Sequence, residues 1–329
     1  TDHQAGPAMT RKASSISQHG VALLGLLFAL VTIGLGVLLS AWTNRQALQT
    51  REQVTQVALQ QAKDAVIGFA ATQSIPGRLP CPENTGSIGT PAEGQAQGSC
   101  STPASRIGRL PWRTLRTGKL LDGDGTELWY AVSPGFASAP INNTTIGQLN
   151  VDGVANAAVA IIIAPGLPLA GQQRTEPTAA NPPQAQDYLD LTNSAGTFVS
   201  GGPAASFNDR ILIISHADLF NAVHRTVLAE VRGLDDQSPG LPVRGLRRYF
   251  TDYGSFPWAA TPGSGSAVAS LTNGSLPYND LNYLGNSTWL ASNGWLPLIA
   301  YTRTSANQAQ IQLGTSTMTV LPCTTLPCP

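Results

Sequence analysis

Charged and aromatic residues are both scarce in this sequence. Asp, Glu, Lys and Arg make up 12% of the 329 residues, about half of the ~25% that is usual for soluble globular domains. Lys plus Arg balance Asp plus Glu at 19 each. Because a neutral chain lacks the positive field that attracts phosphate backbones, we expect no nucleic acid among its partners.

Motifs that would identify an enzyme are also missing. The sequence contains no G-x-S-x-G, no H-E-x-x-H, no phosphate-binding loop and no G-x-G-x-x-G before a predicted strand. Histidine occurs only at positions 3, 19, 216 and 224. The last two lie on one predicted helix, too far apart to share a metal as an i, i+4 pair would. We therefore expect surface histidines and no catalytic activity.

Gly (33), Pro (24) and an even number of cysteines are present instead. Four cysteines behind an apolar N-terminal segment indicate disulfides formed in an oxidising compartment. Of the three possible connectivities, proximity in the sequence favours Cys81–Cys100 and Cys323–Cys328. The alternative is a zinc site, but no Cys-x2-Cys pair occurs and the two pairs lie far apart in the chain.

Residues Val21–Asn44 contain no charge. As a helix they would reach about 36 Å, enough to cross a bilayer. Because Arg11 and Lys12 precede them, the positive-inside rule predicts a single-pass inner-membrane protein with its head in the periplasm. A cleaved secretory signal, whose apolar core is usually shorter, and a plain signal anchor are the alternatives.

The residues that follow predict that this helix continues. Arg45–Gln73 contains no Pro, and its apolar residues recur at helical spacing. We therefore expect one helix over residues 21–75. A membrane helix followed by a coiled-coil stalk is the alternative, but it would need sustained heptads.

The segment Gln18-His19-Gly20 stands directly before the apolar run, and it resembles the class III leader of type IV pilins and pseudopilins. The resemblance implies a leader at residues 1–20, starting at Met9 if that is the true start, and cleavage by prepilin peptidase between Gly20 and Val21. Members of that family usually carry Glu at the fifth mature residue, and this chain has Gly25 there. In the family this carboxylate is thought to pair with the N-terminal amine of the subunit above, so its loss favours a position at the fibre tip, although ordinary drift in a minor subunit would also explain it.

Residues 76–214 resemble the head of the major pseudopilin, most clearly at the turn and strand of residues 120–133. Two interpretations remain open for Asp122, Asp124 and Glu127: turn residues, or a calcium site built from hard oxygen ligands. Further strands are expected at 157–164 and 207–215, with a long surface loop at 171–206. Asp209 is expected to be a turn residue.

Residues 215–329 form a second expected head module. Ser215-His216-Ala217-Asp218 predicts a capping box at the start of a helix, and a second helix is expected over Val243–Asp252. Because a helix followed by a Pro-containing turn occurs in both halves, we interpret the chain as two tandem pilin-like modules.

The sequence thus predicts an α+β fold: a long N-terminal transmembrane and amphipathic helix carrying two antiparallel-sheet head modules. The predicted function is that of a minor pilin or pseudopilin of a type IV pilus or type II secretion pseudopilus. The resemblance implies as partners prepilin peptidase, other pilin or pseudopilin subunits, an inner-membrane assembly platform and membrane lipid. A periplasmic receptor that does not polymerise, or an adhesin that binds through the region of Trp258 and Trp295, are the alternatives.

Overall fold

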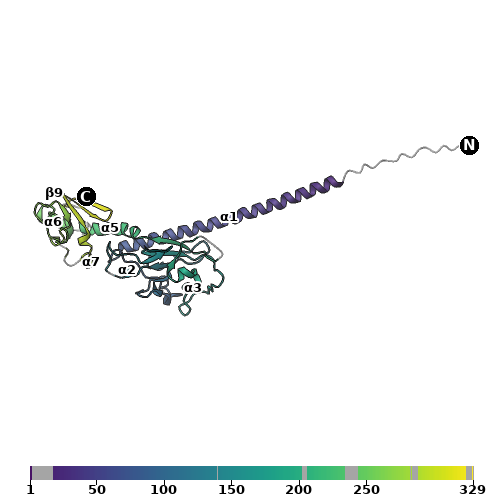
Figure 1. The fold of residues 1–329 in the computed structure, drawn as a ribbon, viewed down its shortest axis with the longest axis horizontal. Coiled ribbons are helices and arrows are strands. Elements are labelled where there is room, and N and C mark those ends of the chain that lie inside the picture. Colours follow the sequence, from purple (N-terminus) through teal and green to yellow (C-terminus); the bar gives the residue numbers. More distant parts are fainter. Residues whose placement is uncertain are drawn as a thin grey trace. The chain divides into compact units, whose positions relative to one another are not determined.

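The computed structural model describes residues 1, 18–138, 140–201, 206–233, 244–281, 283, 288–323 and 328. The chain forms two compact units, Thr1–Glu52 and Gln53–Pro329, and each is described by itself. The first contains the N-terminal part of helix α1, and the second contains every described strand (Figure 1). Of the expected leader 1–20, residues 2–17, with Met9, Arg11 and Lys12, lie outside the described residues.

Helix α1 (Gln18–Thr72) is continuous over 55 residues. It confirms the single long helix expected over residues 21–75, and it ends at Thr72, four residues before Pro76. The expected cleavage position between Gly20 and Val21 lies in its first turn.

The prediction that α1 crosses a membrane is wrong for the residues that the structure describes. None of their helices is both long enough and apolar enough to span a bilayer. The assignment of a single-pass inner-membrane protein with a periplasmic head is therefore not retained.

The second unit is α+β with antiparallel sheets, as predicted. Its first four-stranded sheet has the order β1-β2-β5-β7, and all of its pairs are antiparallel. The strands are β1 (Ile107–Arg109), β2 (Trp129–Val132), β5 (Ala160–Ala164) and β7 (Arg210–Ile214). The apolar run at 157–164 was expected to contain a central strand, and β5 confirms it because all five of its residues are buried between β2 and β7.

A smaller layer covers one face of this sheet. It contains a three-stranded sheet of order β4-β3-β6, in which β3 and β6 are parallel, and two short helices. The elements are β3 (Leu149–Val151), β4 (Val154–Ala158), α3 (Ala185–Tyr188), α4 (Leu191–Ser194) and β6 (Thr197–Phe198). The prediction of a long surface loop at 171–206 is wrong in part, because Leu189 and Phe198 are buried in a hydrophobic cluster with Trp129.

The C-terminal part begins with α5 (His216–Arg232), whose N-terminus carries the predicted capping box of Ser215 and Asp218. The second expected helix is α6 (Gly245–Tyr253), which ends at Gly254 in the left-handed conformation. A second four-stranded antiparallel sheet follows, of order β11-β10-β9-β8. Its strands are β8 (Asn273–Ser275), β9 (Ala300–Ser305), β10 (Gln308–Leu313) and β11 (Ser316–Val320). The remaining short helices are η1 (Thr85–Ser87), η2 (Ala104–Arg106), α2 (Pro134–Ala137), α7 (Thr288–Ser292) and η3 (Leu296–Leu298).

One hydrophobic core joins the C-terminal part of α1, the first sheet, α5 and the second sheet. Leu59, Ala62, Val66 and Ala70 supply the buried stripe of α1. Residues on a strand alternate between its two faces, so Tyr130 enters this core while Trp129 faces the smaller layer. One four-stranded sheet falls within residues 76–214 and the other within 215–329, but their origin by duplication stays a prediction.

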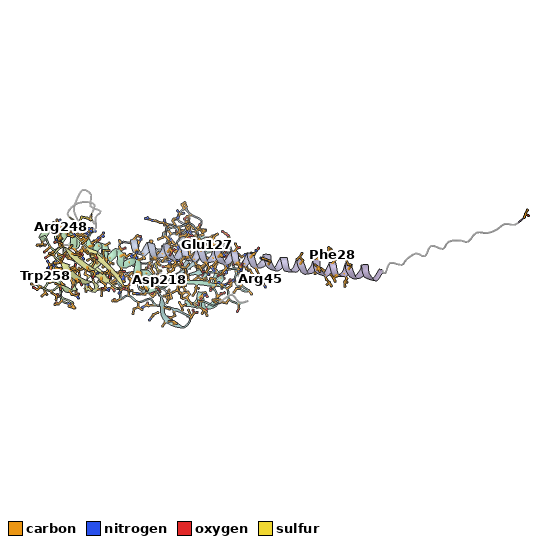
Figure 2. The ribbon with its side chains drawn as sticks, turned by 90° about the horizontal axis from the view of Figure 1, so that it is seen from above. Phe28, Arg45, Glu127, Asp218, Arg248 and Trp258 are labelled. Atoms are coloured by element: carbon orange, nitrogen blue, oxygen red, sulfur yellow. A yellow bond between two sulfur atoms is a disulfide. The ribbon has the colours of Figure 1, made fainter. Side chains whose placement is uncertain are left out.

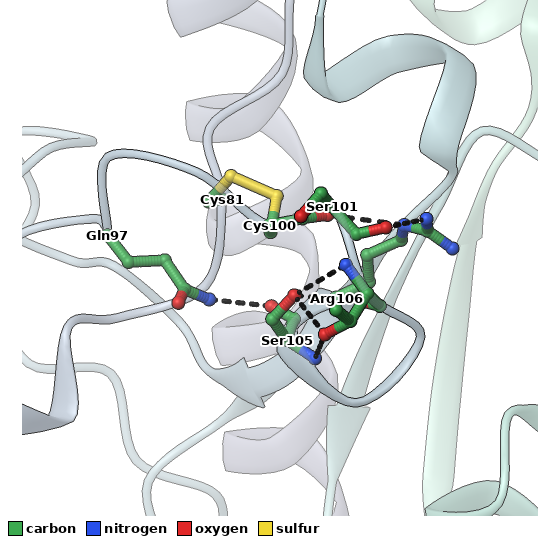
Figure 3. Close-up of a disulfide and its surroundings, with 7 residues drawn as sticks. Cys81, Gln97, Cys100, Ser101, Ser105 and Arg106 are labelled. Carbon is green, nitrogen blue, oxygen red and sulfur yellow. Dashed lines mark hydrogen bonds between the residues drawn. A yellow bond between two sulfur atoms is a disulfide. The ribbon is translucent and has the colours of Figure 1, made fainter.

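Two disulfides join Cys81 to Cys100 and Cys323 to Cys328, with Cα–Cα distances of 5.7 and 4.9 Å. This is the pairing that proximity in the sequence favours, and it excludes the zinc alternative. Around the first disulfide, Gln97 Nε2 donates to the Ser105 carbonyl at 2.6 Å, and Arg106 donates to the carbonyls of Cys100 and Ser101 (Figure 3). The disulfide therefore fixes the loop that leads into β1.

The buried stripe of α1 predicts a clear difference between two substitutions on the same helix. Leu59→Ala empties a site that is 1% exposed, and we expect it to cost about 2–5 kcal/mol of unfolding free energy. Val57→Ala is the matched control, because Val57 is 66% exposed and its loss should change the stability by less than about 0.5 kcal/mol. Urea unfolding followed by circular dichroism measures both, and equal losses would contradict the packing described.

Candidate functional site

The first unit presents an apolar surface that none of its own described residues covers. We call Leu24–Leu35 the apolar α1 segment. Its eight large apolar side chains are 56–74% exposed: Leu24, Leu26, Leu27, Phe28, Leu30, Val31, Ile33 and Leu35. Phe28 stands on this segment, ahead of Arg45 on the same helix (Figure 2). A helix that is apolar all round is normally buried by other elements.

The polar and small residues of the segment fit such burial. The Thr32 hydroxyl donates to the carbonyls of Phe28 and Ala29 at 3.0 and 2.9 Å, so it needs no outside partner. A Cβ built on Gly25 or Gly34 would meet no described atom within 4 Å beyond its own neighbouring turns of helix. Small residues at such positions allow the backbones of two helices to approach closely.

The residues proposed for calcium do not form a metal site. Asp122 Oδ1 accepts from the amides of Asp124 and Thr126, and its Oδ2 accepts from the Gly166 amide, each at 2.9 Å. Burial raises the pKa of Asp122 even though these three amides donate to it. Glu127 contacts cations instead. Among the described residues, no group of three potential ligands is placed to hold a metal ion. Asp122 thus has the role of a turn residue.

Glu127 belongs to an ion cluster around Arg109 (Glu127 is labelled in Figure 2). Arg109 Nε lies 2.6 Å from Glu83 Oε2, and its Nη1 lies 3.1 Å from Glu127 Oε1. Lys119 Nζ bridges Glu127 and Glu93 at 2.6 and 2.8 Å. Both Arg109 and Glu83 are buried, and burial raises the pKa of Glu83 despite its paired guanidinium. This cluster joins three stretches of chain, and nothing in the sequence predicted it.

Asp209, expected to be a turn residue, is fully buried before β7. Its Oδ2 accepts from the Asp190 amide and from Asn193 Nδ2 at 2.9 and 2.8 Å, while its Oδ1 has no partner among the described residues. Asp190 Oδ2 accepts in return from the amides of Asn208 and Asp209. Burial, reinforced by the nearby Asp190 carboxylate, raises the pKa of Asp209 to about 7.

Two aromatic residues of the C-terminal part, His224 and Trp295, are buried. His224, expected on the surface, is buried, and its Nε2 donates to Asn143 Oδ1 at 2.8 Å, whereas His216 Nε2 donates to the Asn143 carbonyl at 3.0 Å. Trp295 is fully buried, and the Trp258 ring lies 3.9 Å from the Arg303 guanidinium. A fully buried Trp295 cannot stack on a glycan, whereas Trp258 is partly exposed, so the adhesin alternative stays a prediction.

Comparison with known proteins returns no match: no family model, no curated protein and no solved structure is significantly similar to this chain.

The raised pKa of Asp209 predicts a dependence of stability on pH. An unfolded Asp titrates near 3.9, so between about pH 4 and 7 the folded chain holds a proton that the unfolded chain has lost. The stability that this proton contributes is fully present below about pH 4. It is lost as the pH rises through 7, and the total loss is at most about 4 kcal/mol. In Asp209→Asn, urea unfolding from pH 4.5 to 7.5 should show a flatter slope.

The matched control is Asp152→Asn. Hydrogen bonds from Ser200 lower the pKa of this exposed carboxylate, so it is ionised in both states across the tested range. The control should keep the wild-type slope. A slope that is unchanged in Asp209→Asn would contradict the assignment of the titrating group.

Proposed function

We propose that this chain is a structural subunit, a minor pilin or pseudopilin, which assembles with other subunits through helix α1. The apolar α1 segment carries the proposal, since it exposes eight large apolar side chains on one continuous helix. The resemblance of Gln18-His19-Gly20 to a pilin leader supports the same function.

The exposed area is sufficient to stabilise an assembly. Burying a Leu, Ile, Val or Phe side chain contributes roughly 1.5–3 kcal/mol. Eight such side chains therefore offer on the order of 10 kcal/mol or more before the entropy costs of association. The neighbouring α1 helices of sister subunits are the occupants that match a surface which is apolar all round.

Gly25 supports a place at the tip of the fibre. In pilins the carboxylate at this position is thought to pair with the amine of the subunit above, and Gly25 has no such group. A subunit without this carboxylate leaves no charged group unpaired when no subunit lies above it. Maturation by prepilin peptidase between Gly20 and Val21, and extrusion by an assembly platform, complete the proposal.

The test places a charge in the centre of the apolar α1 segment. In Phe28→Asp, packing between helices would bury an unpaired carboxylate at a cost of several kcal/mol, so incorporation into fibres sheared from the native host should fall more than about tenfold. The matched control is Ile146→Asp, which adds the same charge to an exposed apolar residue of the head (62% exposed).

The melting temperature of purified Phe28→Asp should equal that of the wild type, because Phe28 lies outside the unit Gln53–Pro329. N-terminal sequencing of the mature chain should give Val21 as its first residue. Normal incorporation of Phe28→Asp, or a mature chain that retains Arg11 and Lys12, would overturn the proposal.

A further inference from the structure

A pocket of about 420 Å³ lies beside Tyr188 in the second unit, and we call it the Tyr188 pocket. Its volume lies within the range of ligand-binding sites. One part of its wall is apolar and contains Ile88, Pro177 and Tyr188. The other part is charged, and its residues are Glu93, Arg109, Lys119, Glu127, Arg174 and Glu176 (Glu127 is labelled in Figure 2). The pocket thus combines an apolar surface with a charged one.

The cations of the pocket have no capacity left for an anionic ligand. Arg109 and Lys119 belong to the ion cluster described above, and both contact Glu127. Arg174 donates through all three of its guanidinium nitrogens to backbone carbonyls, among them that of Tyr188 at 3.0 Å. An anion would therefore find no unpaired cation among the residues that line the pocket.

Two carboxylates of the pocket, in contrast, can accept further hydrogen bonds. Glu176 is exposed, and it has no ion-pair or hydrogen-bond partner among the described residues. Glu127 uses Oε1 for its closest contacts with both Arg109 and Lys119, and its Oε2 accepts no hydrogen bond from a described residue.

The balance of charge points the same way. The ion cluster around Arg109 contains three carboxylates and two cations, and Glu176 adds a fourth carboxylate to the pocket. Even with Arg174 included, the carboxylates outnumber the cations. Since opposite charges attract most strongly where water is partly excluded, the pocket favours a cationic occupant.

Lys119 shows which kind of cation these acceptors bind. Its ammonium nitrogen lies 2.6 Å from Glu127 Oε1 and 2.8 Å from Glu93 Oε1. The apolar wall suits a short aliphatic chain, because methylene groups pack on apolar surface while a charged head stays among polar groups. An inorganic ion would leave that wall without a contact. The two surfaces together therefore match an alkylammonium group.

We propose that the Tyr188 pocket binds an alkylammonium group, supplied by a free amine or by a lysine side chain of a partner protein. The ammonium donates to Glu127 Oε2 and to Glu176, and the alkyl chain lies along the apolar wall. An ammonium has three donors, and the third is directed to the Tyr188 hydroxyl, whose one hydrogen bond, to the Thr175 carbonyl, is 3.5 Å long. The proposal is independent of assembly through α1.

The probe is n-butylammonium chloride, titrated into the full chain near neutral pH and at constant ionic strength while the ring signals of Tyr188 are followed by NMR. Tyr188→Phe assigns those signals among the seven tyrosines. We expect a saturable shift. Butan-1-ol has the same chain without the charge, so it should bind about tenfold more weakly or worse.

A charge reversal tests the location of the site. Glu176→Lys places an ammonium of the chain itself at the pocket, and the affinity for butylammonium should fall about tenfold or more. Asp64→Lys is the matched control. It makes the same change at an exposed carboxylate of α1 that does not line the pocket and whose printed contact is a hydrogen bond from Gln60. This control should bind like the wild type.

A second variant is expected to improve binding. Lys119→Met keeps an aliphatic side chain of similar length but removes the ammonium that competes for Glu127 and Glu93. The affinity for butylammonium should rise about threefold or more. A variant that failed to fold could not produce this gain, and an affinity equal to that of the wild type would contradict the shared acceptors.

Two further ligands identify the source of the group. Tighter binding of acetyl-Gly-Gly-Lys-Gly-Gly-amide than of spermidine assigns the pocket to a lysine of a partner protein, and the reverse order assigns it to a free polyamine. The proposal is overturned if saturating butylammonium leaves the Tyr188 signals unmoved, if butan-1-ol binds equally well, or if Glu176→Lys binds like Asp64→Lys. An equal response to potassium chloride would also overturn it, in favour of a site for inorganic cations.

Discussion

The packing of the second unit depends on the small, buried face of α1. Ala62 and Ala70 are fully buried beside Leu59 and Val66, and alanine at these positions lets other elements approach the helix axis closely. Hydrogen bonds then fix the arrangement. Lys63 Nζ donates to the Ile213 carbonyl and to Asp218 at 3.0 and 2.9 Å. Because Asp218 caps α5, one lysine ties α1, the end of β7 and the start of α5 together.

The two parts of α1 differ in whether their apolar side chains are buried. From Gln53 onward, its apolar residues lie within the core of the second unit. In the first unit, Leu24–Leu35 is apolar on all sides, and no described residue of that unit covers it. The same helix therefore has a buried apolar stripe in the second unit and exposed apolar side chains in the first.

Local patterns in the sequence predicted much of the fold. The Ser215-x-x-Asp218 capping box, the apolar run that became β5, and both disulfides follow from spacing and composition over a few residues. The membrane assignment was wrong for the described residues, and the long loop at 171–206 was predicted without its buried anchors Leu189 and Phe198. Those residues are buried by partners distant in sequence, which periodicity does not reveal.

The sites were harder to predict for the same reason. The Glu83–Arg109 pair spans 26 residues, and the Asp190–Asp209 pair lies across a turn-rich segment with no periodic signal. Asp122 and Glu127 were proposed as joint ligands because they are close in sequence. In the fold, backbone amides donate to Asp122, whereas cations contact Glu127. Their proximity in the sequence therefore led to a wrong prediction of a shared role.

The continuous core has a consequence for the modular organisation of the chain. Phe220 of α5 packs against Phe136 on one side and Trp295 on the other, with ring centroids 6.0 and 5.8 Å apart. Neither half therefore has a complete interior of its own. A gene fusion that exchanged the C-terminal half for another domain would remove both Phe220 and Trp295 and leave Phe136 without its partner, so the new domain would have to bring its own equivalent of α5. Because the two halves share one core, neither can be replaced without a compensating change in the other, whatever their origin.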